Sequence, residues 1–215
     1  MELSRRLNHK RVIAESYHFL GRVNHLQGQH SKAEEYYQRS LSLFQNMKSK
    51  LYHFPILNLY ELCLLNLDQQ KSNQVTKYLN ELKDLMYTSD LKSPLIYSQL
   101  AEVHFLKQSK RFKEKSKAQD ILQKLLEEEN LTYQIRYTCR TLLSDLMLEE
   151  VMVFGDEELF DETKPKFKQL TDLISSWNFK PANTKNLVLQ AKLTLVEEST
   201  DQTFVFLDEA NAIAE

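Results

Sequence analysis

Apolar and small side chains near the start of the chain recur at the three- and four-residue spacing of an amphipathic helix. One face of the first segment carries Tyr17, Leu20, Gly21 and Asn24. The pattern breaks at Gly28, and the same spacing resumes on a second segment that carries Ala33, Tyr37 and Ser40. Because antiparallel helices approach closely only where side chains are short, these segments predict a tightly packed helical hairpin.

The hairpin pattern repeats along the chain about every 42 residues. The position of Gly21 recurs at Cys63, Leu106, Leu148 and Ala191. In the second helices, the position of Ala33 recurs at Val75, Ala118, Phe160 and Thr203, and the position of Tyr37 at Leu79, Leu122, Lys164 and Leu207. These positions form the seam, the packed contact between the two helices of a hairpin. Most of the residues are apolar, as such a contact requires, with Lys164 and Thr203 as polar exceptions. Gly28 and Gly155 both fall at the predicted hairpin turn.

The first hairpin resembles the tetratricopeptide repeat family. The residues that match the family pattern are Tyr17, Leu20, Gly21, Ala33 and Tyr37, with Ser40 and Gln45 where the family usually has Ala and Pro. The period is longer than the family's usual 34 residues, so each helix is about one turn longer. Such lengthened repeats are similar to those of the bacterial maltose-regulon activator group, and residues 187–197 resemble that group too.

The resemblance and the period together predict an all-α fold, a right-handed superhelical solenoid of about five antiparallel helix hairpins. The expected hairpins lie near residues 8–50, 51–92, 93–131, 132–178 and 179–215. The expected helices lie near 8–27, 30–48, 54–69, 72–88, 93–109, 112–129, 132–153, 157–177, 184–197 and 201–214. Pro55 and Pro165 are expected near first helical turns, where a missing N–H costs nothing. We expect a single repeat domain over residues 1–215, either complete or an excerpt of a longer array.

Composition excludes several classes of protein. A hydrophobic content of 42% suffices for a core, and only three glycines and four prolines argue against a turn-rich β fold. No Gly-rich phosphate-binding string occurs. A net charge of -2 argues against a nucleic-acid partner or an anionic membrane surface. The start of the chain lacks a signal-peptide pattern and no window is apolar enough to span a bilayer, so we expect a cytoplasmic protein.

The residues that could carry chemistry favour a structural interpretation. Cys63 and Cys139 lie in apolar helical patterns and are expected to be reduced and buried. His18 and His25 share a helix face but lie about 10 Å apart along its axis, too far to bind one zinc ion. No nucleophile has a partner at a plausible spacing. We therefore expect no enzyme activity, no metal and no cofactor.

The resemblance implies that the first helices line a concave groove. Carrying the groove positions onto this sequence gives candidate binding residues in each hairpin: His18, Arg22 and His25, then Tyr60, Leu64 and Leu67, then Lys107 and Lys110, then Asp145 and Glu149, and finally Lys192. Such a groove has an apolar middle and flanking charges, which suits a mixed-charge amphipathic helix or extended peptide. The alternative is that Tyr60 and its neighbouring leucines pack the core.

The function predicted from these features is a non-enzymatic scaffold that binds a protein or peptide. The alternative is a sensory or regulatory domain that binds a signalling peptide or a small ligand. The terminal helices carry no polar capping unit, which solenoids need to stay soluble. Association of copies through these terminal helices is therefore expected, unless further repeats cover them.

Overall fold

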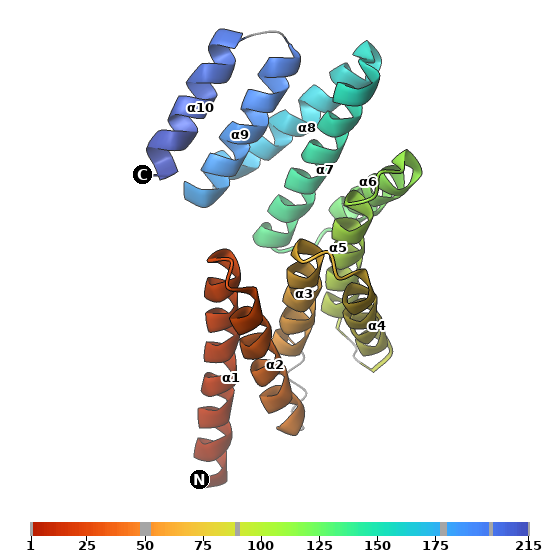
Figure 1. Cartoon of the computed structure of the whole chain (residues 1–215). Coiled ribbons are helices and arrows are strands. Elements are labelled where there is room, and N and C mark those ends of the chain that lie inside the picture. The colour runs from red at the N-terminus through yellow and green to blue at the C-terminus, as the bar shows by residue number, and fades with distance from the viewer. Residues whose placement is uncertain (1, 48–52, 89–90, 177–179, 198–199, 215) are drawn as a thin grey trace. The chain divides into compact units, whose positions relative to one another are not determined.

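The computed structural model describes residues 2–47, 53–88, 91–176, 180–197 and 200–214. All ten expected helices are present, and no strand occurs within these residues, so the prediction of an all-α fold is confirmed (Figure 1). The predicted boundaries at residues 48, 50, 51 and 177–179 lie outside the described residues.

The chain forms two compact units, residues 1–109 and 110–215. The helices of unit 1 are α1 (Glu2–Leu26), α2 (His30–Asn46), α3 (His53–Asp68), α4 (Ser72–Thr88) and α5 (Ser93–Lys107). The helices of unit 2 are α6 (Phe112–Glu127), α7 (Tyr133–Phe154), α8 (Glu157–Ser175), α9 (Lys180–Val196) and α10 (Thr200–Ala214). The third predicted hairpin therefore has its two helices in different units, and the single superhelical domain stays a prediction.

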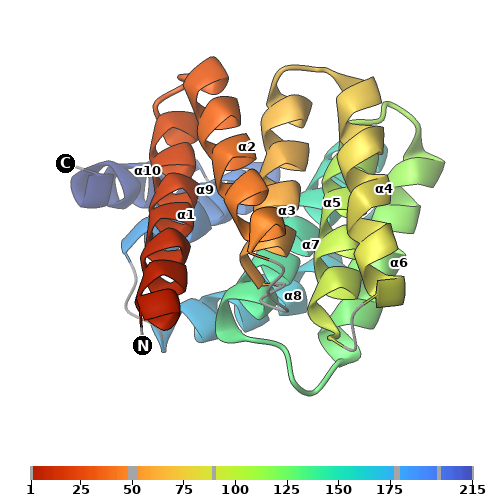
Figure 2. The ribbon, with the colours of Figure 1, turned by 90° about the horizontal axis from the view of Figure 1, so that it is seen from below.

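Within each unit, consecutive helices pack as hairpins, and each hairpin packs on the next. In unit 1, α1 pairs with α2 and α3 with α4, while α5 packs against both α3 and α4. Figure 2 shows α1, α2, α3 and α4 side by side in that order. In unit 2, α7 pairs with α8 and α9 with α10, and α9 contacts both helices of the preceding hairpin. Each unit is thus built by repeating one packing step.

The predicted seam is buried in every first helix. Gly21 and its four equivalents, Cys63, Leu106, Leu148 and Ala191, are all buried. A Cβ atom on Gly21 would lie only 2.6 Å from ring carbons of Tyr37, so the first hairpin needs a glycine at this position. The close approach of α1 and α2 inferred from the small side chains is confirmed.

A residue with left-handed backbone conformation closes the first, second and fourth hairpins. Gly28 and Gly155 adopt left-handed backbone conformations, with φ of 71° and 63°, as the register predicts. The equivalent residue of the second hairpin is Gln70, with φ of 57°. The Gly28 and Gln70 amides both donate to the carbonyl three residues earlier, at 2.9 Å. The Gly155 amide instead donates to the Val151 carbonyl, four residues earlier, at 2.8 Å. The first and second hairpins therefore share one turn geometry although the second lacks glycine.

The predicted seam of the fourth hairpin is wrong by about one helical turn. In α2 the buried residues are Ala33, Tyr37, Ser40 and Phe44. In α8 the same spacing is found at Thr163, Phe167, Leu170 and Ile174, so Phe160 and Lys164 are not the seam residues. Lys164 is exposed, with its ammonium group 4.3 Å from the centre of the Phe160 ring. Asp156 caps the first turn of α8 by accepting from the Glu158 amide at 2.9 Å. The buried residues of α8 begin after this turn, at Thr163.

Three further residues, one polar and two prolines, have identifiable places in the helices. Thr203 is buried, and its hydroxyl lies 3.0 Å from that of Thr194, which explains a polar residue at a seam position. Pro55 lies in the first turn of α3, as expected. Pro165 does not lie in a first turn but inside α8, where it removes one backbone donor.

Candidate functional site

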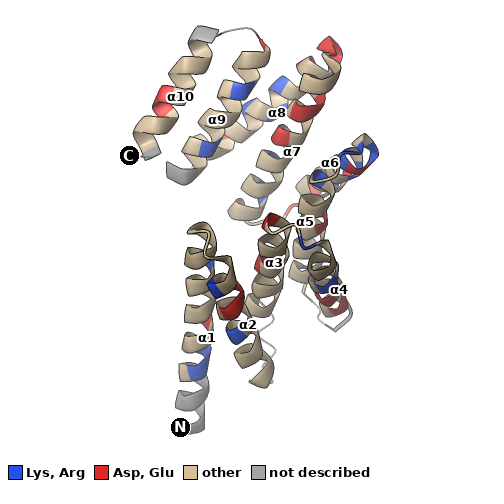
Figure 3. Ribbon diagram, in the orientation of Figure 1, with Lys and Arg blue, Asp and Glu red and all other residues tan. Residues whose placement is uncertain are grey.

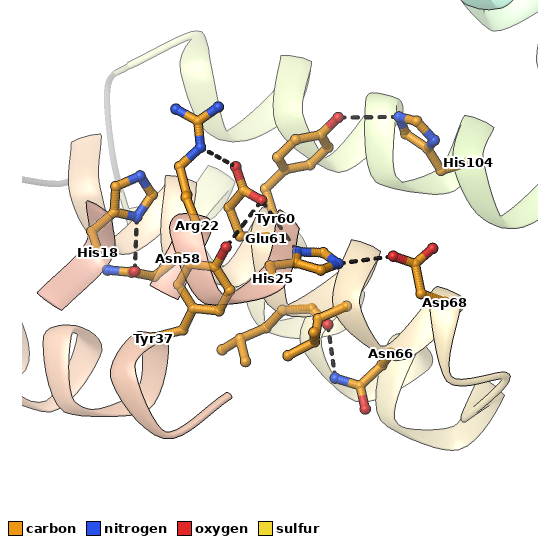
Figure 4. A network of polar contacts seen from close by, with 12 residues as sticks. His18, Arg22, His25, Tyr37, Asn58, Tyr60, Glu61, Asn66, Asp68 and His104 are labelled. Atoms are coloured by element: carbon orange, nitrogen blue, oxygen red, sulfur yellow. Dashed lines mark hydrogen bonds and ion pairs between the residues drawn. The ribbon is translucent and has the colours of Figure 1, made fainter. Parts of the chain in front are cut away.

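A buried hydrogen-bond chain joins α1, α2 and α3, and Figure 4 shows its link between His18 and Asn58. His18 is 2% exposed, and its Nδ1 lies 3.0 Å from Oδ1 of Asn58. The Asn58 amide donates to Oγ of Ser40 at 2.9 Å, and the Ser40 hydroxyl donates to the carbonyl of Ala14 at 2.7 Å. Burial lowers the pKa of His18, opposed by its bond to Asn58. A neutral imidazole that donates to Asn58 therefore fixes the start of α3 against the first hairpin.

A half-buried carboxylate, Glu61, forms the second link between α1 and α3. Its oxygens lie 3.3 Å from Nε of Arg22 and 3.4 Å from the hydroxyl of Tyr37. Burial raises the pKa of Glu61, while the charges of Arg22 and His25 and the bond from Tyr37 oppose that rise. His25 also bonds Asp68, with Nε2 2.8 Å from Oδ2. Both ends of α3 are thus held to α1 by polar contacts.

The same type of link continues from α3 to α5. The hydroxyl of Tyr60 lies 3.2 Å from Nε2 of His104, and the rings of Tyr60 and Tyr97 have their centres 5.2 Å apart. The side-chain amide of Gln108 donates to the carbonyl of Leu67 at 3.3 Å. Polar contacts therefore hold α1 to α3 and α3 to α5, and we call these contacts between first helices the locks.

Several predicted binding residues belong to these locks rather than to an open surface. His18, Tyr60 and Leu67 are buried, as the core alternative predicts for Tyr60 and its leucines. His25 is half-buried between Glu61 and Asp68.

Three predicted residues stay accessible at equivalent positions of α1, α3 and α5. Arg22 is exposed, and Leu64 and Lys107 are half-buried. We call Arg22, Leu64 and Lys107 the first-helix row. Lys110 is also exposed, directly after α5.

The predicted residues of unit 2 form ion pairs between helices. Asp145 of α7 lies 3.3 Å from Nζ of Lys192 on α9. Glu149 of α7 accepts from Nζ of Lys115 on α6 at 2.8 Å. Figure 3 shows acidic and basic residues interspersed on these helices. The charges predicted to orient a partner thus also connect α7 to the next first helix, α9, and to the preceding second helix, α6.

Sequence reasoning missed the structural importance of Asn58 and Glu61. Both stand in residues 53–68, an otherwise strongly apolar helix. A polar side chain in such a helix is expected to be hydrogen-bonded when buried, which was the available signal. Their partners, however, lie 18 to 40 residues away in the preceding hairpin and could not be assigned from one sequence.

A cleft of about 360 Å³ lies between α6, α7 and α8 in unit 2. Its lining consists of Gln123, Leu126, Glu127, Arg140, Leu143, Lys166 and Gln169. Nε of Arg140 is buried without a hydrogen-bond partner. Burial and the positive charge of Arg136 lower the pKa of Arg140. Neither Arg140 nor Lys166 forms an ion pair with a carboxylate among the described residues, and the cleft lining has two cationic side chains and one carboxylate, Glu127.

The cysteines are poor nucleophiles. Cys63 and Cys139 are buried, and burial raises the pKa of each thiol to about 12.

Over the described ranges, no three His, Cys, Asp or Glu side chains are grouped so that they could hold a metal ion. In the same part of the chain, no helix has both the length and the apolar character that crossing a bilayer demands.

A tetratricopeptide repeat family model matches residues 1–46, which contain α1 and α2. No curated protein and no solved structure gives a match to the chain. The matched segment is the hairpin in which Gly21 contacts Tyr37 and in which the buried seam keeps the family's spacing. The first hairpin is therefore similar to a tetratricopeptide repeat, a family whose members generally mediate protein–protein interaction and are typically not enzymes.

Proposed function

We propose that the chain is a non-enzymatic scaffold that binds a protein or peptide along the first-helix row of unit 1. The observation that supports this function is the set of locks between α1, α3 and α5. They hold three neighbouring helices in place while Leu64 and Lys107 stay accessible, and Arg22 stays exposed although it is paired with Glu61. A surface that is already ordered loses little entropy when a partner binds.

The chemistry of the row indicates the kind of partner. Leu64 lies at the middle position, and the cationic Arg22 and Lys107 lie at the equivalent positions on either side of it in the repeat. An apolar anchor gives affinity, and flanking charges fix orientation. We therefore expect a segment with one apolar side chain between acidic residues.

The test compares partner capture by the full chain and by two variants. Leu64→Asp and Lys107→Glu are expected to weaken binding of the captured partner at least about tenfold, a loss of about 1.4 kcal/mol. Leu43→Asp is the matched control, because Leu43 is also a half-buried leucine but lies on α2. Affinity is then measured with the purified partner, and circular dichroism checks the fold. Equal affinities for the row variants and the control would exclude the first-helix row.

The cleft of unit 2 supports a second candidate function, the sensing of a small anionic ligand or an acidic peptide. Its volume is within the range of small-ligand sites, and Arg140 and Lys166 supply positive charge. Inorganic phosphate is expected to raise the melting temperature of the full chain. Lys166→Gln should remove that rise, whereas Lys168→Gln, an exposed lysine outside the cleft lining, should not. No rise with phosphate, or equal rises for both variants, would exclude this site.

A further inference from the structure

Three of the first helices, α3, α5 and α9, share a face that packs against the preceding hairpin. In α9 this face consists of Ala182, Leu189, Leu193 and Val196, which all pack in one cluster with residues of α7 and α8. In α3 the equivalent positions include Phe54, whose ring stacks on Phe44 of α2 with centres 5.5 Å apart, and Leu65, which is fully buried.

Helix α5 uses the same positions. There, Tyr97 and His104 contact Tyr60, and Gln108 donates to the carbonyl of Leu67. One face of the repeat thus serves the same purpose in α3, α5 and α9. We call it the leading face.

The leading face of α1 is apolar and largely exposed, although its Phe19 ring also lies edge-on to Phe54 of α3 with centres 6.2 Å apart. By the same register it consists of Val12, Phe19, Val23 and Leu26. These four side chains are between 49% and 86% exposed. Four large apolar side chains exposed together on one helix face are typical of an interaction site rather than of a solvated surface.

The opposite surface of each hairpin, which we call the trailing face, receives the next first helix. In the first hairpin it includes His18, His25 and Tyr37, which contact Asn58, Asp68 and Glu61 of α3. In the last hairpin the equivalent residues are Val188 and Leu195 of α9 and Leu207 of α10. These three side chains are apolar and between 37% and 56% exposed.

We propose that the leading face of one copy of this chain binds the trailing face of a second copy, head to tail. The two faces are the two halves of the contact that already joins successive hairpins inside each unit. Both are apolar where they are uncovered, so their association buries surface that neither hides by itself. Because the two faces differ, the contact is heterologous and can continue to a third copy. It does not involve the first-helix row and therefore stands or falls independently of the proposed function.

The test is the mass of the full chain in solution as a function of concentration, by light scattering or sedimentation equilibrium. The wild-type mass is expected to rise steadily above that of one 25.4 kDa chain. Val23→Glu, on the leading face, and Leu195→Glu, on the trailing face, should each stay monomeric. A mixture of the two variants should form a complex of two chains and nothing larger, because each variant retains the face that the other lacks.

The matched control is Val153→Glu. Val153 has the register position of Leu26, but on α7, and it is 62% exposed. This variant should associate like the wild type. Circular dichroism establishes that each variant is folded, and Leu26→Lys and Val188→Lys replace any variant that is not.

Three outcomes would overturn the proposal. The wild-type chain could remain a monomer at every concentration. Only the leading-face variant could lose association, which would indicate a symmetric pair of α1 helices. The mixed variants could fail to form a complex of two chains.

Discussion

At the scale of single residues, Gly21 sets the distance between α1 and α2. A methyl group at this position would overlap the Tyr37 ring, whose nearest carbons would lie 2.6 Å away. Gly21→Ala is therefore expected to lower the free energy of unfolding by about 1–3 kcal/mol, measured by urea denaturation. In a Tyr37→Leu background the added methyl group has room, so the same substitution should cost clearly less. Equal losses in both backgrounds would show that the Tyr37 ring does not limit the approach.

His18 gives the protein a pH-dependent stability. Burial holds the pKa of His18 below its ordinary value of 6.5, so the unfolded chain takes up this proton before the folded chain does. The contribution of a neutral His18 is complete above pH 6.5 and declines as the pH falls from 6.5 towards the lowered pKa. His18→Gln keeps an N–H donor near Asn58 but does not titrate.

The measurement is the difference in unfolding free energy between wild type and His18→Gln, from about pH 8 down to about pH 5.5. The wild type should lose stability relative to the variant as the pH falls through this range. The raised pKa of Glu61 acts on both proteins and cancels in the difference. A difference that does not change with pH would mean that His18 is not buried as described.

At the scale of turns and helices, Gln70 occupies a position where the first and fourth hairpins have glycine. Its φ of 57° lies in the left-handed region, which costs a residue with a side chain about 1 kcal/mol. Gln70→Gly should therefore raise the free energy of unfolding by up to about 1 kcal/mol, measured by thermal and urea denaturation. The neighbouring Gln69→Gly is the control and should bring no gain. A loss of stability in Gln70→Gly would contradict the shared turn geometry.

Pro165 weakens the interior of α8. It lies in the middle of a 19-residue helix and cannot donate a backbone hydrogen bond. Because Pro165 is exposed, Pro165→Ala loses little packing and should raise the free energy of unfolding by about 1–3 kcal/mol. Lys168→Ala, also exposed on α8, should change it by less than about 0.5 kcal/mol. A destabilised Pro165→Ala variant would indicate that the distortion at Pro165 is needed for the packing of α8.

The sequence was most informative at this scale of elements. Helical spacing and the positions of Gly28 and Gly155 gave the helices and turns, because these features are local. The seam of α8 was misplaced because a fixed offset from Ala33 cannot detect that a helix has moved along its partner by one turn. Phe160 and Lys164 have the right spacing, but Phe160 precedes the packed stretch, which begins at Thr163, and Lys164 lies on the exposed side of the helix.

At the scale of the whole molecule, much of the candidate site could not be predicted. The accessible positions Arg22, Leu64 and Lys107 followed from the family resemblance. The burial of His18 and Tyr60 depends on partners in the next hairpin, Asn58 and His104, each 40 or more residues away. Such pairings are set by how hairpins stack, which one sequence does not encode locally.

Stacking of successive hairpins in one register underlies both the first-helix row and the leading face of α1. Nuclear Overhauser contacts in the full-length protein, labelled at aromatic and methyl groups, test it most directly. We expect cross-peaks between Phe44 and Phe54 and between Tyr60 and Tyr97, whose ring centres lie 5.5 Å and 5.2 Å apart. Contacts that instead join these rings to unrelated helices, as in a closed bundle, would contradict the repeat register.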